Sequence, residues 1–303
     1  MAKFGQVWPC DGVDEHTAAG HVGIIVPLRG SNNVILMDGS ALKVSSTRSP
    51  AVQVQEIDDP HAHPIWADLV VAALAIGKLK VGAIRVFKVT GNSLVGIDVA
   101  EIRATNAHTS KVEATLKVIV LRQKLIRISI RPVQIHDELG HVLSFTNAPV
   151  DARKLLDQMN AVWEPQANVV FDLGKTDPAL IDGLSPKAIG ADIQNPTLLA
   201  SFMSKKDPAA DFTAFLVRRA LDGNSQVSGV TNSEAGFALI SDDRSDRTLA
   251  HEAGHFLGSL NAHGKFSHRY GDRGLDPDLL MRGGGAGRKI PFGLVTDFNK
   301  GYR

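Results

Sequence analysis

The sequence predicts a protein of the α+β class, with a β-rich N-terminal domain (residues 1–110) followed by a domain that combines a sheet with helices (residues 111–303). Short runs of Val, Ile and Leu between turn-forming residues predict the strands, and two later segments with helical spacing predict the helices. A length of 303 residues allows two domains. With 44% hydrophobic and 21% charged residues, the chain has enough apolar side chains to bury a core.

The N-terminal region alternates between apolar runs and residues that favour turns. Runs that are bounded by Gly, Asn, Ser or Pro predict strands at residues 21–28, 33–37, 51–57, 81–90 and 94–103. The longest apolar stretch, residues 65–76, is shorter than the roughly 20 residues that a membrane-spanning helix needs. We therefore expect a buried helix there and no membrane span. The polar stretch 104–110 predicts the domain boundary.

The pattern changes in the second domain. Residues 151–163 carry Leu155, Leu156, Met159 and Val162 at helical spacing and predict a helix. A final helix is expected to open at Ser245 or Asp246, which are good N-cap residues, and to end at Gly258. Strands are predicted at residues 112–120, 125–133, 168–173, 212–218, 227–229 and 236–241.

Charge and cysteine content exclude several classes of protein. Lys and Arg total 33 against 32 for Asp and Glu, so no basic surface for nucleic acid is expected. Cys10 is the single cysteine, which excludes an intramolecular disulfide and means that His and carboxylate side chains must hold any metal. The N-terminus lacks the apolar core of a secretory signal peptide. We expect a chain that is cytoplasmic at synthesis, and export by a specialised route stays open.

The segment 251–255 reads H-E-x-x-H and carries the chemistry. Residues four apart on a helix share a face, so His251 and His255 can bind one metal ion. Glu252 is turned by about 100° from His251, and its carboxylate can act on a metal-bound water instead of ligating. Gly258 can end the helix in a left-handed turn that leads the chain back toward the metal.

These residues resemble the metzincin clan of zinc metallopeptidases, whose signature is H-E-x-x-H-x-x-G-x-x-H followed by a methionine turn below the metal. His251, Glu252, His255 and Gly258 match this pattern, and Met281 within Leu-Leu-Met-Arg-Gly resembles the methionine turn. The resemblance covers about residues 111–303, where the predicted order of helix and strands is similar to that of the family's upper subdomain.

The resemblance implies a zinc-dependent endopeptidase that hydrolyses peptide bonds through a zinc-bound water activated by Glu252. The cofactor would be Zn²⁺, and the partner would be a protein or peptide substrate. The family's edge strand, which corresponds to residues 229–240 here, would hold an extended substrate by adding a strand to the sheet. The sequence leaves the oligomeric state and the cleavage specificity open.

The third zinc ligand departs from the signature, because position 261 holds Asn261 and an amide is a poor zinc ligand. In an extended segment residues i and i+2 point the same way, so His263 is the predicted third ligand. His268 and Asp272 are alternatives that require larger loops. The rival interpretation is a catalytically inactive zincin-like binding module, in which Asn261 marks a site that has lost its metal.

Overall fold

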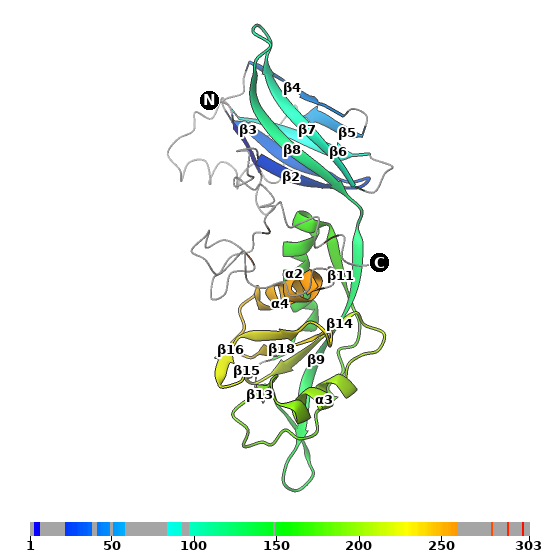
Figure 1. Ribbon diagram of the computed structural model, residues 1–303, viewed down its shortest axis with the longest axis vertical. Helices are drawn as coiled ribbons and strands as arrows, with labels where there is room; N and C mark the ends of the chain where they lie inside the picture. Colours follow the sequence, from blue (N-terminus) through cyan, green and yellow to red (C-terminus); the bar gives the residue numbers. More distant parts are fainter. Residues whose placement is uncertain are drawn as a thin grey trace. The chain divides into compact units, whose positions relative to one another are not determined.

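The computed structural model describes residues 3–6, 22–37, 41–48, 51–57, 84–92, 97–147, 149–259, 280, 290 and 299 (Figure 1). The chain forms two compact units. One consists of Met1–Gln123, Glu164–Asn168 and Lys289–Asn299, and the other of Lys124–Trp163, Val169–Arg288 and Lys300–Arg303.

The described part of the first unit consists of two four-stranded sheets. One sheet has the order β1 (Lys3–Gln6), β3 (Ser31–Met37), β6 (Ile84–Gly91) and β5 (Val52–Glu56). The other has the order β2 (Val22–Pro27), β8 (Val112–Leu121), β7 (Ile97–Asn106) and β4 (Leu42–Ser46). Buried residues from both sheets, such as Leu36 and Val118, belong to one apolar cluster. Alternating inward side chains therefore build this core between two sheets.

The division between the units differs from the predicted boundary after residue 110. The apolar run at 112–120 becomes β8, which pairs with β7 and with β2 inside the first unit. The first unit therefore continues to Gln123 before β9 begins the second. The expected helix at 65–76 lies outside the described residues.

A mixed sheet organises the second unit (Figure 1). Its strand order is β10-β9-β14-β18-β17, and β11 and β12 also pair with β9. β14 runs parallel to both of its neighbours, β9 and β18, whereas the edge strand β17 pairs antiparallel with β18. The strands are β9 (Lys124–His136), β10 (Val142–Ser144), β11 (Val169–Leu173), β12 (Ala179–Leu180), β14 (Phe212–Val217), β17 (Gly229–Asn232) and β18 (Phe237–Ser241).

Two of the helices cover opposite faces of this sheet. Neighbouring residues of a strand point to opposite faces, so Phe212 and Phe215 of β14 face different layers. Phe212 stacks on Phe256 of α4 (Thr248–Ser259), with ring centroids 4.9 Å apart. Phe215 packs against Phe202 of α3 (Pro196–Ser204) at 5.0 Å. Every residue of β14 and β18 is buried, as expected for strands that are covered on both faces.

The helix α2 (Ala152–Ala167) lies between β10 and β11 in the chain. A separate small sheet consists of β13 (Ala191–Asp192), β15 (Ala220–Asp222) and β16 (Ser225–Val227). With three helices and several sheets in its described part, the protein belongs to the mixed helix-and-sheet class. No helix within the described ranges is long and apolar enough to cross a membrane.

Two predicted elements need correction. The last helix begins at Thr248, because Ser245 to Thr248 form a turn in which the Ser245 amide donates to Thr248 Oγ1 at 3.0 Å. The expected edge strand at 229–240 is a hairpin of β17 and β18. The chain reverses at Gly236, which has a φ of 68° in the left-handed region that glycine tolerates best.

Candidate metal centre

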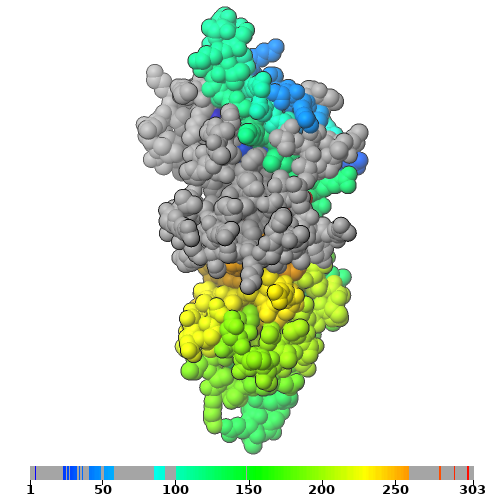
Figure 2. Space-filling model, in the orientation of Figure 1, coloured from blue at the N-terminus to red at the C-terminus, as the bar shows by residue number. Residues whose placement is uncertain are grey.

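Helix α4 carries both histidines of the H-E-x-x-H segment on one face. The Nε2 atoms of His251 and His255 lie 3.2 Å apart, and their rings meet edge to face with centroids 4.9 Å apart. Both side chains are half-buried. Figure 2 shows a strip of orange surface from α4 beside the yellow surface of the β16–β18 segment. The structure thus brings the two predicted ligands together.

The distance between the two Nε2 atoms fits zinc. Zinc binds imidazole nitrogen at about 2.0–2.1 Å in tetrahedral sites, which places two ligating nitrogens about 3.3 Å apart. The 3.2 Å separation in the protein is close to this value. The two imidazoles therefore stand at the spacing that a tetrahedral zinc ion requires of two of its ligands.

A backbone carbonyl fixes the orientation and tautomer of His251. Its Nδ1 lies 2.7 Å from the carbonyl oxygen of Leu280. Because a carbonyl can only accept, Nδ1 carries the proton and the neutral ring keeps the lone pair on Nε2, the form that ligates metal. Arg247 also donates to Leu280 O at 2.8 Å. Burial lowers the pKa of Arg247, and the charges of Asp246 and Glu252 act in the opposite direction.

Glu252 faces the edge strand instead of solvent. It is 4% exposed, and the hydroxyl of Thr231 in β17 donates to its Oε2 at 2.6 Å. Burial raises the pKa of Glu252 to about 7, whereas the hydrogen bond from Thr231 and the charge of Arg247 act to lower it. A carboxyl with such a pKa can both take and return a proton near neutral pH.

Gly229 allows the edge strand to approach Glu252 closely. A Cβ at this position would lie 2.8 Å from Glu252 Cγ, from Glu252 Oε1 and from Thr248 Cγ2. Residues two apart in a strand share a face, so Gly229 and Thr231 together form the surface against which the carboxylate rests.

The remaining predicted site residues have different outcomes. Gly258 is buried within the last turn of α4, which continues to Ser259. Asn261, His263, His268, Asp272 and Met281 lie outside the described residues. Leu280, next to Met281, is described and buried. Within the described part of the chain, no group of three or more His, Cys, Asp or Glu side chains is arranged to hold a metal.

Three side chains around the site were not expected from the sequence: Thr231, Arg247 and Trp163. The indole Nε1 of Trp163 in α2 donates to the carbonyl of Ala250 at 3.0 Å, and the Trp163 side chain is fully buried. Of these residues, only Thr231 had a signal in the sequence, because it lies in the 229–240 segment that was predicted to form the edge strand along the site. Trp163 and Arg247 contribute through long-range contacts that have no local pattern.

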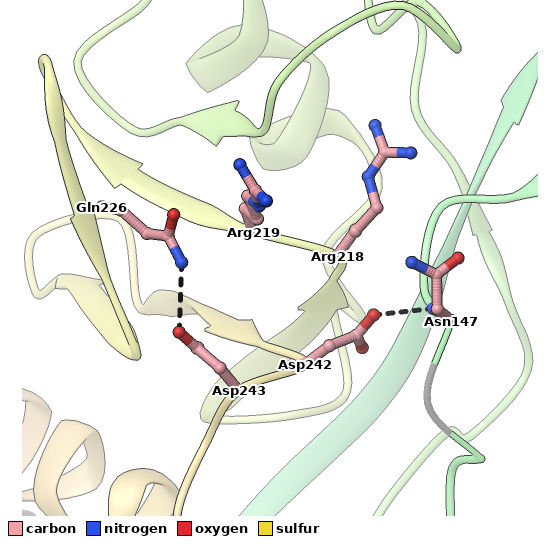
Figure 3. Close-up of a pocket in the computed structure, with 6 residues that line it drawn as sticks. All are labelled: Asn147, Arg218, Arg219, Gln226, Asp242 and Asp243. Carbon is pink, nitrogen blue, oxygen red and sulfur yellow. Dashed lines mark hydrogen bonds between the residues drawn. The ribbon is translucent and has the colours of Figure 1, made fainter.

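A separate pocket of about 540 Å³ lies at the carboxyl ends of β14 and β18 (Figure 3). Its polar groups are largely engaged. Asp242 accepts from the amide of Asn147 at 2.6 Å, and Asp243 accepts from Gln226 at 3.1 Å. Arg218 donates to the carbonyl of Ala188 at 2.6 Å. None of the lining residues belongs to the H-E-x-x-H segment, so this pocket is separate from the candidate metal centre on α4.

The chain matches no protein-family profile, and a comparison with curated proteins finds no match to its sequence. The functional argument therefore depends on the residues of α4 and their surroundings.

Proposed function

We propose that this protein is a zinc-dependent endopeptidase of metzincin-like type. In this proposal His251 and His255 are two zinc ligands, His263 is the third, and Glu252 is the general base. The observation that carries the proposal is the 3.2 Å separation of the two Nε2 atoms, which fits two corners of a tetrahedral zinc site.

Two further observations support the metzincin-like assignment. The order of α2, β11, β14, an antiparallel edge strand and α4 is the order of elements on which the resemblance was based. The carbonyl of Leu280 accepts from His251, so the residue before Met281 lies at the candidate metal centre. A methionine turn at Met281 would therefore begin next to a ligand.

The proposed chemistry is hydrolysis of a peptide bond. Zinc bound at this site would lower the pKa of a water molecule and polarise the peptide carbonyl. Glu252 accepts a proton from the attacking water, whose oxygen bonds to the carbonyl carbon. As the C–N bond breaks, Glu252 passes that proton to the departing amine.

The edge strand β17 provides a binding surface for an extended substrate. β17 pairs with β18 on one side, and no other strand in the described ranges pairs with it. Its second side can offer backbone N–H and C=O groups to a peptide chain. Because Gly229 and Thr231 contact Glu252, a peptide added to this strand would pass beside the proposed base.

The test of the proposal uses Glu252→Gln and a fluorescently labelled casein as substrate. The variant should keep its zinc and lose hydrolysis by a factor of about 10² or more, because the amide cannot take a proton. His263→Ala, prepared in parallel, should lose zinc. Hydrolysis by the Glu252→Gln variant at the wild-type rate would refute the role of Glu252 as general base. An unchanged zinc content in His263→Ala would exclude His263 as the third ligand.

The alternative is a catalytically inactive zincin-like binding module. The observation that favours it is Asn261, which stands at the position of the family's third ligand. It predicts no zinc in the wild-type chain after incubation with the metal, and no cleavage of casein.

A further inference from the structure

We propose that the Thr231 hydroxyl positions the Glu252 carboxylate through a hydrogen bond, and that Gly229, which has no side chain, leaves the space that this carboxylate occupies. The inference rests on the proposed function, since it concerns the residue assigned there as general base. Thr231 is a positioning residue that acts through Glu252.

The contact between the two side chains is short and buried. The Thr231 hydroxyl lies 2.6 Å from Glu252 Oε2 and 3.1 Å from the Glu252 backbone carbonyl. One hydroxyl proton cannot serve both fully, and the shorter contact, to the side-chain oxygen, is the stronger bond. The hydroxyl therefore anchors the side chain at its tip.

Gly229 places the second carboxylate oxygen. The position that a Cβ of residue 229 would occupy is 2.8 Å from Oε1 and from Cγ of Glu252. The carboxylate thus lies below β17 with Oε2 at Thr231 and Oε1 at Gly229. With only 4% of Glu252 exposed, little solvent is available to replace the Thr231 hydrogen bond.

This arrangement has a consequence for catalysis. A general base has to be held within hydrogen-bond reach of the proton that it takes, and small errors in its position are costly. β17 is also the strand that is proposed to hold the substrate. The same strand would then align the peptide and orient the base, so the position of the peptide bond relative to the carboxylate would be fixed.

The first test compares Thr231→Val with Thr231→Ser. The valine keeps the shape and removes the hydroxyl, so kcat on labelled casein should fall at least about tenfold while KM changes by less than about twofold. The serine restores the hydroxyl and should keep kcat within about threefold of wild type. Thr213→Val alters a buried threonine in β14 whose hydroxyl accepts from the backbone amide of Asp207, and it should leave kcat unchanged.

Wild-type kcat in Thr231→Val would overturn the proposal, as would a Thr231→Ser variant that is as impaired as the valine variant. An inactive wild-type protein would instead refute the proposed endopeptidase function.

The second test needs no activity and uses chelator-treated full-length protein. Urea unfolding is measured for wild type, Thr231→Val, Glu252→Met and the double variant. Thr231→Val should raise the unfolding constant by about fivefold or more when Glu252 is present, because it leaves a buried carboxylate without its donor. In the Glu252→Met background the same change should have less than about a twofold effect. Equal effects in both backgrounds would show that the hydroxyl does not hold Glu252.

Discussion

Gly229→Ala tests whether close contact between β17 and α4 is required at the site. An added Cβ would stand 2.8 Å from three atoms, two on Glu252 and one on Thr248, whereas ordinary contacts begin at 3.4 Å. Each contact is therefore about 0.6 Å too short, and the strand or the carboxylate has to move. Overpacking of this kind costs about 1–3 kcal/mol. Gly229 has no positive φ, so lack of space is the reason for this cost.

We expect Gly229→Ala to lower the free energy of unfolding by about 1–3 kcal/mol and to reduce casein hydrolysis by about 10²-fold, because it displaces the proposed base Glu252. Urea unfolding and initial rates measure the two effects. The matched control is Gly223→Ala, in the β15–β16 turn, where the backbone φ of 62° strains an alanine but no atom lies within 4 Å of the Cβ. It should lose stability and keep activity. Equal loss of activity in both variants, or none in either, would refute the reasoning.

Three further predictions concern stability. Trp163→Phe removes the donor to the Ala250 carbonyl and should cost about 1–2 kcal/mol in urea unfolding; an unchanged midpoint would show that this hydrogen bond does not anchor α4. Phe202→Ala should cost about 3–5 kcal/mol, because its ring packs against two aromatic rings of the sheet, and a loss below 1 kcal/mol would contradict this packing. Burial raises the pKa of the Asp207 carboxyl, but the hydrogen bonds from Ser129 and the Ala209 amide, with the charge of Lys175, bring it below its usual value. The ionised Asp207 carboxylate therefore stabilises the fold above about pH 4, and this contribution is lost as the pH falls through the lowered pKa. Asp207→Asn should be less stable than wild type at pH 7, and the difference in free energy of unfolding between the two proteins should narrow in acid. A constant gap from pH 7 to pH 2 would contradict that linkage.

The sequence predicted most of the described strands of the first unit and the strands of five or more residues in the second, because their apolar runs are local signals. The runs at 125–133 and 212–218 became β9 and β14, and the helical spacing at 151–163 became α2. The edge strand was wrong in extent. The segment 229–240, which was assigned to a single edge strand of the family, turns at residues 233–236 and forms the two paired strands β17 and β18.

The residues of the candidate site also divide into those that have a local signal in the sequence and those that have none. His251, Glu252 and His255 were predicted because helical geometry relates residues one and four apart without reference to the rest of the fold. Thr231 and the Leu280 carbonyl reach the site from other segments, and a backbone carbonyl leaves no trace in the sequence. Arg247 was also missed, since its hydrogen bond to Leu280 depends on the path of a distant segment.

The most direct test of the central claim is the zinc content per chain by elemental mass spectrometry, for wild type, His251→Ala and His255→Ala. The control His141→Ala removes an exposed histidine of the β9–β10 hairpin. The account predicts one zinc per chain in wild type and in the control, and none in either ligand variant. Absence of zinc from wild type after incubation with the metal, or equal zinc in all four proteins, would contradict a metal centre on α4.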